Sequence, residues 1–165
     1  MLNYGLLWLL LVSGATAQTQ YGTAPKAGPT AHARTGCPWL TQGNAAWALG
    51  GDVSVTVNVP NIGEGSCVFS REQAPTDSLE ILVSKSALPA CPPESGTLKG
   101  IGNEAARCRP PASHGESLEM ISSRVRDLHF TVTLISRGQK GHAKPDDPQN
   151  DVLGQVAEQV AGNLY

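Results

Sequence analysis

The sequence predicts an α+β fold: an antiparallel sheet of about five strands, packed by a short N-terminal helix and by a C-terminal helix. Apolar and polar residues alternate over residues 53–59 and again over 128–135, which is typical of strands with one buried face. Helical patterns occur only before the first of these strands and after the last. Because no helix separates consecutive strands, the pattern favours antiparallel strands over βαβ units.

The first helix is predicted in the sequence CPWLTQGNAAWALGG, which begins at Cys37. Thr41 is the expected N-cap, Leu40 precedes it as a hydrophobic staple, and Gly50 with Gly51 ends the helix. The expected apolar face consists of Ala45, Ala46, Trp47 and Leu49.

Turn residues divide the middle of the chain into strands. Pro60, Asn61 and Gly63 predict the first turn, and Arg126 with Asp127 predicts the last. The five expected strands are 53–59, the segment around 67–69, 79–83, 118–125 and 128–135. Residues 86–99 contain three prolines and are expected to be irregular.

The last helix is predicted from about Pro148 to Leu164, where valines recur every four residues. Asp147 is the expected N-cap, with Pro148 at the first helical position. This explains the nearby oxygen-bearing side chains without a calcium ion, because the spacing lacks the alternating ligands and turn glycine of a calcium loop. These side chains are Asp146, Asp147, Asn150 and Asp151.

The first 17 residues have the pattern of an export signal. They carry no charged side chain, contain an apolar stretch from Gly5 to Val12, and end in the small residues Ala15 and Ala17. The apolar stretch is about half as long as the ~20 residues of a membrane span. We therefore predict cleavage between Ala17 and Gln18, an exported protein in the periplasm or outside the cell, and no membrane span after cleavage.

The rest of the chain is expected to form a flexible leader over residues 18–36 and a single domain over 37–165. The leader contains almost no large apolar side chain, so it cannot bury enough surface to offset its ordering. The formal net charge is -2 and the basic residues are scattered. This gives no electrostatic reason to expect nucleic acid as a partner.

Four cysteines follow the predicted signal: Cys37, Cys67, Cys91 and Cys108. In an exported protein an even number of cysteines predicts disulfides, and four allow three pairings. Sequential pairing closes the shortest loops, and each bond would then stabilise the fold by roughly 3 kcal/mol. Zinc is not favoured, because no C-x-x-C pair is present.

Residues 100–108, GIGNEAARC, contain the pattern G-x-G-x-x-A of dinucleotide-binding loops, in Gly100, Gly102 and Ala105. That site needs a buried strand before the motif and a helix after it. Prolines precede the motif and follow Cys108, which excludes both. We interpret the motif as a glycine-rich turn that leads Glu104–Cys108 onto the edge of the sheet, and we expect no cofactor.

No residue is predicted to be catalytic or to bind a metal. The chain lacks the nucleophile pattern G-x-S-x-G, and Glu116 and Glu119 are expected to face opposite sides of one strand. No two histidines have the spacing of a metal site. The four histidines are His32, His114, His129 and His142.

Five features occur in a familiar order: the CPWLT…AAWALGG helix, GSCVF at 65–69, GIGNEA at 100–105, the hairpin SRVRDLHFTVTL, and the closing helix. Over about residues 37–164 the chain resembles a family of small exported bacterial domains of unknown function, many of them envelope lipoproteins. The resemblance implies a Cys37–Cys67 disulfide, which leaves Cys91 and Cys108 to pair. It also implies an α/β sandwich similar to some ligand-sensing extracellular domains, without catalytic residues. Membrane tethering is not implied, because no cysteine follows the predicted cleavage site directly.

We therefore expect an exported, soluble, disulfide-stapled binding module of the bacterial envelope. Its ligand, a small molecule or an envelope protein, is expected between the sheet and the helices. Two alternatives stay open. An envelope hydrolase of unrecognised type would need a cleft of convergent polar groups. A secreted inhibitor or effector would dock through residues 86–99, with a rigid, exposed Cys91 loop and apolar tips such as Leu88.

Overall fold

The computed structural model describes residues 36–165, except for 62, 93–94, 113–114 and 138–150. The predicted signal cleavage at Ala17 and Gln18 lies outside the described residues, as does all of the predicted leader except Gly36. The elements are α1 (Gln42–Leu49), β1 (Val53–Asn61), β2 (Glu64–Arg71), β3 (Ala74–Ser84), β4 (Gly96–Leu98), β5 (Glu104–Cys108), β6 (Glu116–Val125), β7 (Leu128–Arg137) and α2 (Val152–Gly162).

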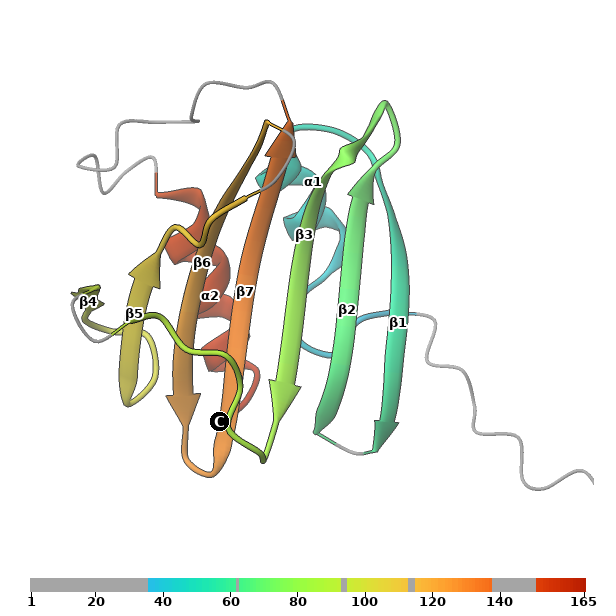
Figure 1. Cartoon of the computed structure of the whole chain (residues 1–165). Coiled ribbons are helices and arrows are strands. Elements are labelled where there is room, and N and C mark those ends of the chain that lie inside the picture. The colour runs from blue at the N-terminus through green and yellow to red at the C-terminus, as the bar shows by residue number, and fades with distance from the viewer. Residues whose placement is uncertain (1–35, 62, 93–94, 113–114, 138–150) are drawn as a thin grey trace, which may run out of the picture. The chain divides into compact units, whose positions relative to one another are not determined.

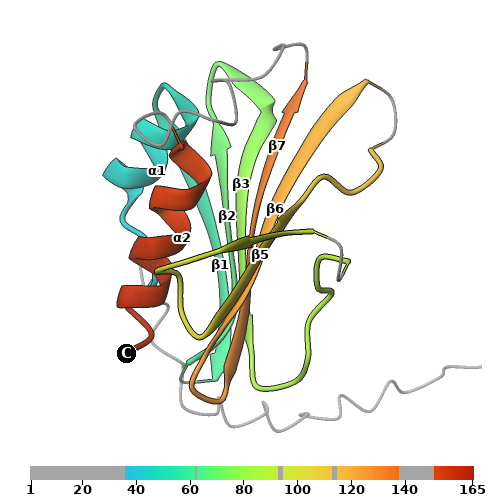
Figure 2. The same ribbon diagram turned by 90° about the vertical axis from the view of Figure 1, so that its left-hand side faces the viewer.

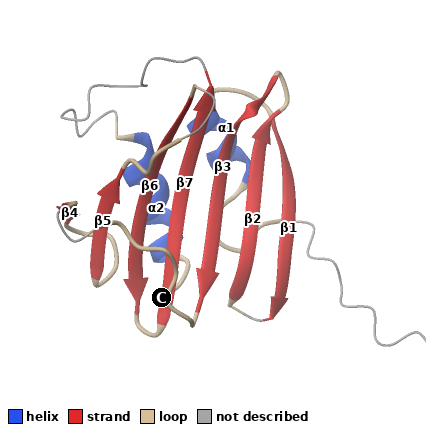
Figure 3. Cartoon of the chain, in the orientation of Figure 1, coloured by secondary structure: helices blue, strands red, loops and turns tan. Residues whose placement is uncertain are grey.

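All seven described strands form one antiparallel sheet in the order β1-β2-β3-β7-β6-β5-β4 (Figure 1). The α+β class is confirmed, and Figure 3 shows that strands predominate over helices in the described part of the chain. The prediction of about five strands was too low, because β4 and β5 were not expected as strands. β4 lies within the segment 86–99, and only Ala105 of β5 is buried. Neither segment carries the alternation of large apolar residues that marks a strand. Pairing decides their conformation instead, of β5 with β6 and of β4 with β5.

Both helices lie on the same face of the sheet (Figure 2). α1 contacts β1, β2 and β3, whereas α2 contacts β6 and β7. The helices cover the side chains of alternate strand residues, which form the hydrophobic core. The largest of these fully buried side chains are Phe69, Leu79, Ile81, Ile121 and Phe130.

The caps of α1 are those that the sequence predicts. The Thr41 hydroxyl oxygen accepts a hydrogen bond from the backbone N–H of Asn44 at 3.2 Å, and Gly50 ends the helix in the left-handed conformation. The predicted apolar face was wrong in one residue, because Trp47 is 52% exposed. Trp47 is two residues from both Ala45 and Leu49, so it lies about 200° around the helix from each of them. Only Ala45 and Leu49 are buried.

α2 begins later than predicted, at Val152, and its N-cap is Asp151 rather than Asp147. The Asp151 carboxylate accepts the backbone N–H of Gly154 at 2.9 Å and also pairs with the guanidinium of Arg107 on β5. The contact with Arg107 holds the cap against the sheet, which the local sequence does not reveal. The expected cap Asp147 and the expected first residue Pro148 lie outside the described residues.

Arg71 and Asp77 tie the β2–β3 hairpin to its neighbours. The Arg71 guanidinium donates to the carbonyl of Leu49 at the end of α1 (3.3 Å) and lies 3.4 Å from the Asp77 carboxylate. Asp77 is buried, and its other oxygen accepts the backbone N–H of Arg137 at 3.1 Å. A buried carboxylate held in this way joins α1, the hairpin and the end of β7.

The two disulfides pair the cysteines in sequence order. Cys37–Cys67 joins the segment before α1 to a fully buried position on β2. Cys91–Cys108 joins the segment after β3 to the end of β5. This pairing is the one that the resemblance implies.

Gly100 and Gly102 lie in the turn before β5, and both have positive φ, at 86° and 63°. A Cβ atom on Gly102 would lie 2.5 Å from the carbonyl oxygen of Arg124 and 2.7 Å from the hydroxyl of Ser123. A Cβ atom on Gly100 would have nothing within 4 Å. The second glycine is therefore required by the close approach of the turn to β6.

We expect Gly102→Ala to lower the free energy of unfolding by about 3 kcal/mol or more, and Gly100→Ala by about 1 kcal/mol. Both variants place an L-residue in the left-handed region, but only the first forces a methyl group against the backbone of β6. Urea unfolding of the two variants measures the difference. Equal losses would contradict the close approach of residue 102 to β6.

Candidate functional site

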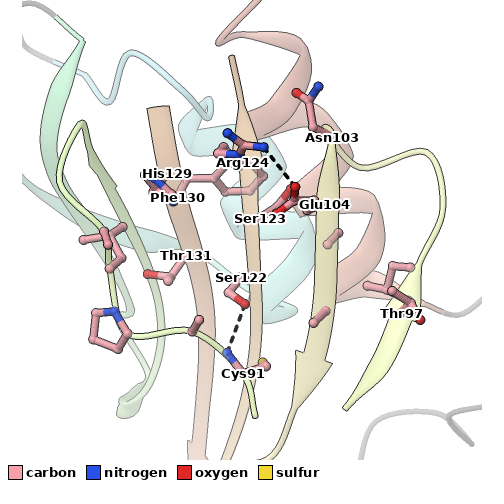
Figure 4. Close-up of a pocket in the computed structure, with 17 residues that line it drawn as sticks. Cys91, Thr97, Asn103, Glu104, Ser122, Ser123, Arg124, His129, Phe130 and Thr131 are labelled. Carbon is pink, nitrogen blue, oxygen red and sulfur yellow. Dashed lines mark hydrogen bonds and ion pairs between the residues drawn. The ribbon is translucent and has the colours of Figure 1, made fainter. Parts of the chain in front are cut away.

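A pocket of about 450 Å³ lies on the face of the sheet opposite to the helices. Residues 87–91 form its roof, and β5, β6 and β7 form its floor (Figure 4). Figure 2 shows the segment after β3 on one side of the sheet and both helices on the other.

The floor of the pocket follows from strand register. Side chains of directly paired residues lie beside one another on the same face of a sheet. Two cross-strand rows result: His129, Arg124 and Glu104 form one, and Thr131, Ser122 and Ala106 form the other. The intervening residues Phe130 and Ser123 are buried, and their side chains point to the core face. They border the pocket but do not project into it from its floor.

Two bonds hold the roof above this floor. The Cys91–Cys108 disulfide ties the roof to β5. The backbone N–H of Cys91 donates to the hydroxyl oxygen of Ser122 at 3.1 Å, and Figure 4 shows this bond near the centre of the pocket. Ser122 therefore positions the roof rather than standing free in the pocket.

One end of the pocket carries charged groups. The Arg124 guanidinium lies 2.9 Å from the Glu104 carboxylate, and these side chains are 41% and 75% exposed. An ion pair this exposed contributes little to stability, so a ligand group can replace one partner at small cost. Asn103 joins the start of β5 to the end of β6. Its N–H donates to the Arg124 carbonyl at 2.7 Å, and its side-chain oxygen accepts from the N–H of Arg126.

The pocket combines a mainly apolar roof with a few convergent polar groups, as small-molecule sites do. Ala87, Leu88, Pro89 and Ala90 supply the apolar side. Acid–base or nucleophilic catalysis requires hydrogen-bonded groups such as a hydroxyl and an imidazole. Within the part of the chain that the structure describes, no hydrogen bond joins His129 to a hydroxyl, and the Ser122 hydroxyl is engaged by Cys91.

The structure brings one of the four histidines to the pocket, His129. His32, His114 and His142 lie outside the described residues, as do Asp146, Asp147 and Asn150. The described residues contain no group of three or more His, Cys, Asp or Glu side chains that could hold a metal. Asp151 caps α2, as described above.

Glu116 and Glu119 form separate ion pairs, as expected from their opposite orientations on β6. The Glu116 carboxylate lies 2.7 Å from the Arg137 guanidinium. The Glu119 carboxylate lies 3.7 Å from Arg107 and 3.4 Å from Arg109. The two carboxylates are therefore not an acid pair.

The G-x-G-x-x-A segment is a turn that leads into a strand. After Gly102 the chain enters β5, which pairs with β6 on one side and with the short edge strand β4 on the other. Ala105 is buried within β5. The interpretation of the motif as a turn feeding Glu104–Cys108 onto the edge of the sheet is confirmed, with β4 added outside it.

The pocket does not lie between the sheet and the helices, where the sequence analysis expects the ligand, but on the other face of the sheet. A second hollow of about 440 Å³ does adjoin α1, but six residues line it, compared with 17 for the first. They are Gln42, Gly43, Ala46, Asp52, Val53 and Glu72. The first pocket is the better candidate because it has both a roof and a floor.

Sequence reasoning missed most of the pocket. Alternation along the last strand does place His129 and Thr131 on the side away from the core, so part of the floor was visible in the sequence. For the roof, the expected Cys91–Cys108 pairing placed Cys91 near Cys108, but nothing placed residues 87–91 over this face of the sheet. Leu88, which the inhibitor or effector alternative would place at an exposed tip, is half-buried and lines the pocket in the segment that the disulfide ties to β5.

Comparison with models of protein families, with curated proteins and with solved structures finds no match for this chain. The resemblance to exported bacterial domains therefore stays a prediction. Among the described residues, no helix has both the length and the apolar character needed to cross a membrane.

We expect the double variant Cys91→Ala/Cys108→Ala to lower the free energy of unfolding by about 3 kcal/mol and to release the roof. Backbone amides of residues 86–92 should then exchange with deuterium faster, while those of β2 and β3 keep their relative protection. Mass spectrometry of peptic peptides measures this exchange. The matched control, Cys37→Ala/Cys67→Ala, removes a bond distant from the roof. Equal exchange of the roof in both double variants would contradict its attachment through Cys91–Cys108.

Proposed function

We propose that this chain is an exported, disulfide-stapled binding module of the bacterial envelope or the extracellular space, and that its ligand occupies the pocket beneath residues 87–91. The observation that carries this proposal is a roofed pocket whose two sides are joined by the Cys91–Cys108 bond and by the Cys91–Ser122 hydrogen bond. A pocket held open by such bonds costs little ordering when a ligand enters.

Two features support export. All four cysteines form disulfides, which persist in oxidising compartments outside the cytoplasm. The predicted signal over residues 1–17 precedes them in the chain. Periplasm and extracellular space are both compatible with these features.

The chemistry of the lining favours a small molecule with an apolar body and an anionic end. The body would pack against Leu88 and Pro89 of the roof. The anionic end would face Arg124 and His129, taking the place of the exposed Glu104 carboxylate beside the guanidinium. A carboxylate bound to Arg in this way forms charge-assisted hydrogen bonds, which are stronger than bonds between neutral groups.

The two other predicted functions, an envelope hydrolase and a secreted inhibitor or effector, have no arrangement of described residues in their favour. The hydrolase would need a nucleophile and a base in contact. The inhibitor would need an exposed apolar tip, whereas Leu88 is half-buried against the pocket. Both stay predictions.

We expect medium-chain carboxylic acids to bind the protein and Ala106→Leu to weaken that binding by roughly tenfold or more, because added methyl groups fill the floor. Chemical shift changes in a two-dimensional ¹H–¹⁵N spectrum measure the affinity and locate the site. Amines of the same chain length are the ligand control, since they carry the opposite charge and should bind far more weakly.

The matched control variant is Thr133→Leu. Thr133 lies on β7, on the same face of the sheet as Ala106, but outside the pocket lining. It should leave the affinity within about twofold of the unmodified chain. The proposal fails if no carboxylate perturbs the amides of residues 87–91 and 104–106, or if both variants bind equally well.

A further inference from the structure

The outer edge of β1 has no role in the proposed function. β1 stands at the end of the strand order, on the right of the sheet in Figure 1, and pairs only with β2. Among the described residues, no strand pairs with its other edge. An edge strand presents a row of N–H and C=O groups that can pair with another chain.

The two edges of the sheet differ in how well they are protected. At the far edge, β4 has three residues, which is too short to template another strand. β1 has nine residues, and its sequence VSVTVNVPN contains no charged side chain. Its protective features lie at its two ends: the Gln42 side-chain amide donates to the Val53 carbonyl at 2.6 Å, and Pro60 and the register shift between Asn58 and Asn61 lie at the other end. Residues 54–59 therefore form the unprotected part of this edge.

The side chains along this edge are only partly covered. Val55 and Val57 face the helix-bearing side, since they pair with the buried residues Phe69 and Cys67 of β2. They are nevertheless half-buried, as is Val59. The core thus ends at β1 with a row of partly exposed valines, and a further strand beside β1 would cover them.

The sequence of the edge is symmetric in chemistry about Thr56. Valines stand one and three residues from Thr56 on both sides, and polar uncharged residues, Ser54 and Asn58, stand two residues away on both sides. An antiparallel copy related by a two-fold axis at Thr56 would set valine opposite valine on one face. On the other face it would set Ser54 opposite Asn58 and Thr56 opposite itself. No like charges would meet across this contact. An isologous interface needs such self-complementarity, because each residue faces the symmetry copy of the same surface.

We propose that two copies of this chain associate through β1, antiparallel and centred on Thr56, and so extend the sheet across both copies. The two-fold axis is perpendicular to the sheet, so the helices of both copies lie on the same side and the valine rows become continuous. The pocket over β5–β7 is separated from β1 by β2 and β3 in the strand order, so the inference is independent of the proposed function.

A single pair of edge strands is smaller than a standard interface of about 1,200–2,000 Å², so we expect a dimer that dissociates on dilution. Sedimentation velocity of the full chain, with both disulfides formed, should show monomer at low and dimer at high concentration. Thr56→Lys should raise the dissociation constant by roughly tenfold or more, because two ammonium groups would meet at the axis. The side chain of Thr56 is exposed, so the monomer should keep its circular dichroism spectrum.

The matched control is Thr76→Lys, which adds the same charge at an exposed position of β3, away from the edge. It should leave the dissociation constant within about twofold of the unmodified chain. A chain that is monomeric at every concentration overturns the proposal. A dimer that Thr56→Lys and Thr76→Lys affect equally overturns the assignment to β1, and would place the contact on another surface.

Cysteine cross-linking tests the register. Opposed residues of antiparallel strands have Cα atoms about 4.5–5.5 Å apart, which suits a disulfide. Thr56→Cys should therefore give a covalent dimer on mild oxidation. Ser54→Cys, which is also exposed and lies on the same face, should not, because residue 54 opposes Asn58. Equal cross-linking of the two variants overturns the two-fold axis at Thr56. No cross-linking of Thr56→Cys in a solution that contains dimer does the same.

Discussion

The packing of both helices on one face of the antiparallel sheet is the constraint on which the other features depend. Burying Phe69, Ile81, Ile121 and Phe130 beneath α1 and α2 supplies the hydrophobic core. The Cys37–Cys67 bond holds the segment before α1 against β2, and the Arg71–Asp77 pair holds the other end of α1. With one face covered in this way, the opposite face remains accessible for the segment after β3 to cross.

That crossing segment turns a flat surface into a pocket. An antiparallel sheet alone presents rows of side chains without concavity, and here the roof at residues 87–91 encloses two of these rows. The Cys91–Cys108 bond attaches the roof covalently to the end of β5. The same sheet leaves β1 with an uncharged, unpaired edge at its other end. Ligand binding and self-association would therefore use separate parts of one sheet.

Part of the candidate site could be predicted from the sequence, and the limit has a physical cause. Alternation in the last strand places His129 and Thr131 away from the core, because side chains of a strand alternate between its faces. It says nothing about which segment will lie over that face. The roof depends on a covalent contact between Cys91 and Cys108 and on a hydrogen bond to Ser122, 31 residues away from Cys91. No local pattern in residues 86–99 encodes either contact.

The sequence by itself determined the α+β class, the strands at β1 and β7, the Thr41 and Gly50 caps of α1, and the turn at Gly100 and Gly102. Each of these depends on interactions within a few residues, which composition and spacing express directly. Only the tertiary structure decided that Glu104–Cys108 pairs on both of its sides, with β6 and with β4, that Trp47 faces outward, and that Asp151 starts α2. Each of these outcomes is set by a neighbour distant in sequence: β6 for β5, the sheet for α1, and Arg107 for Asp151.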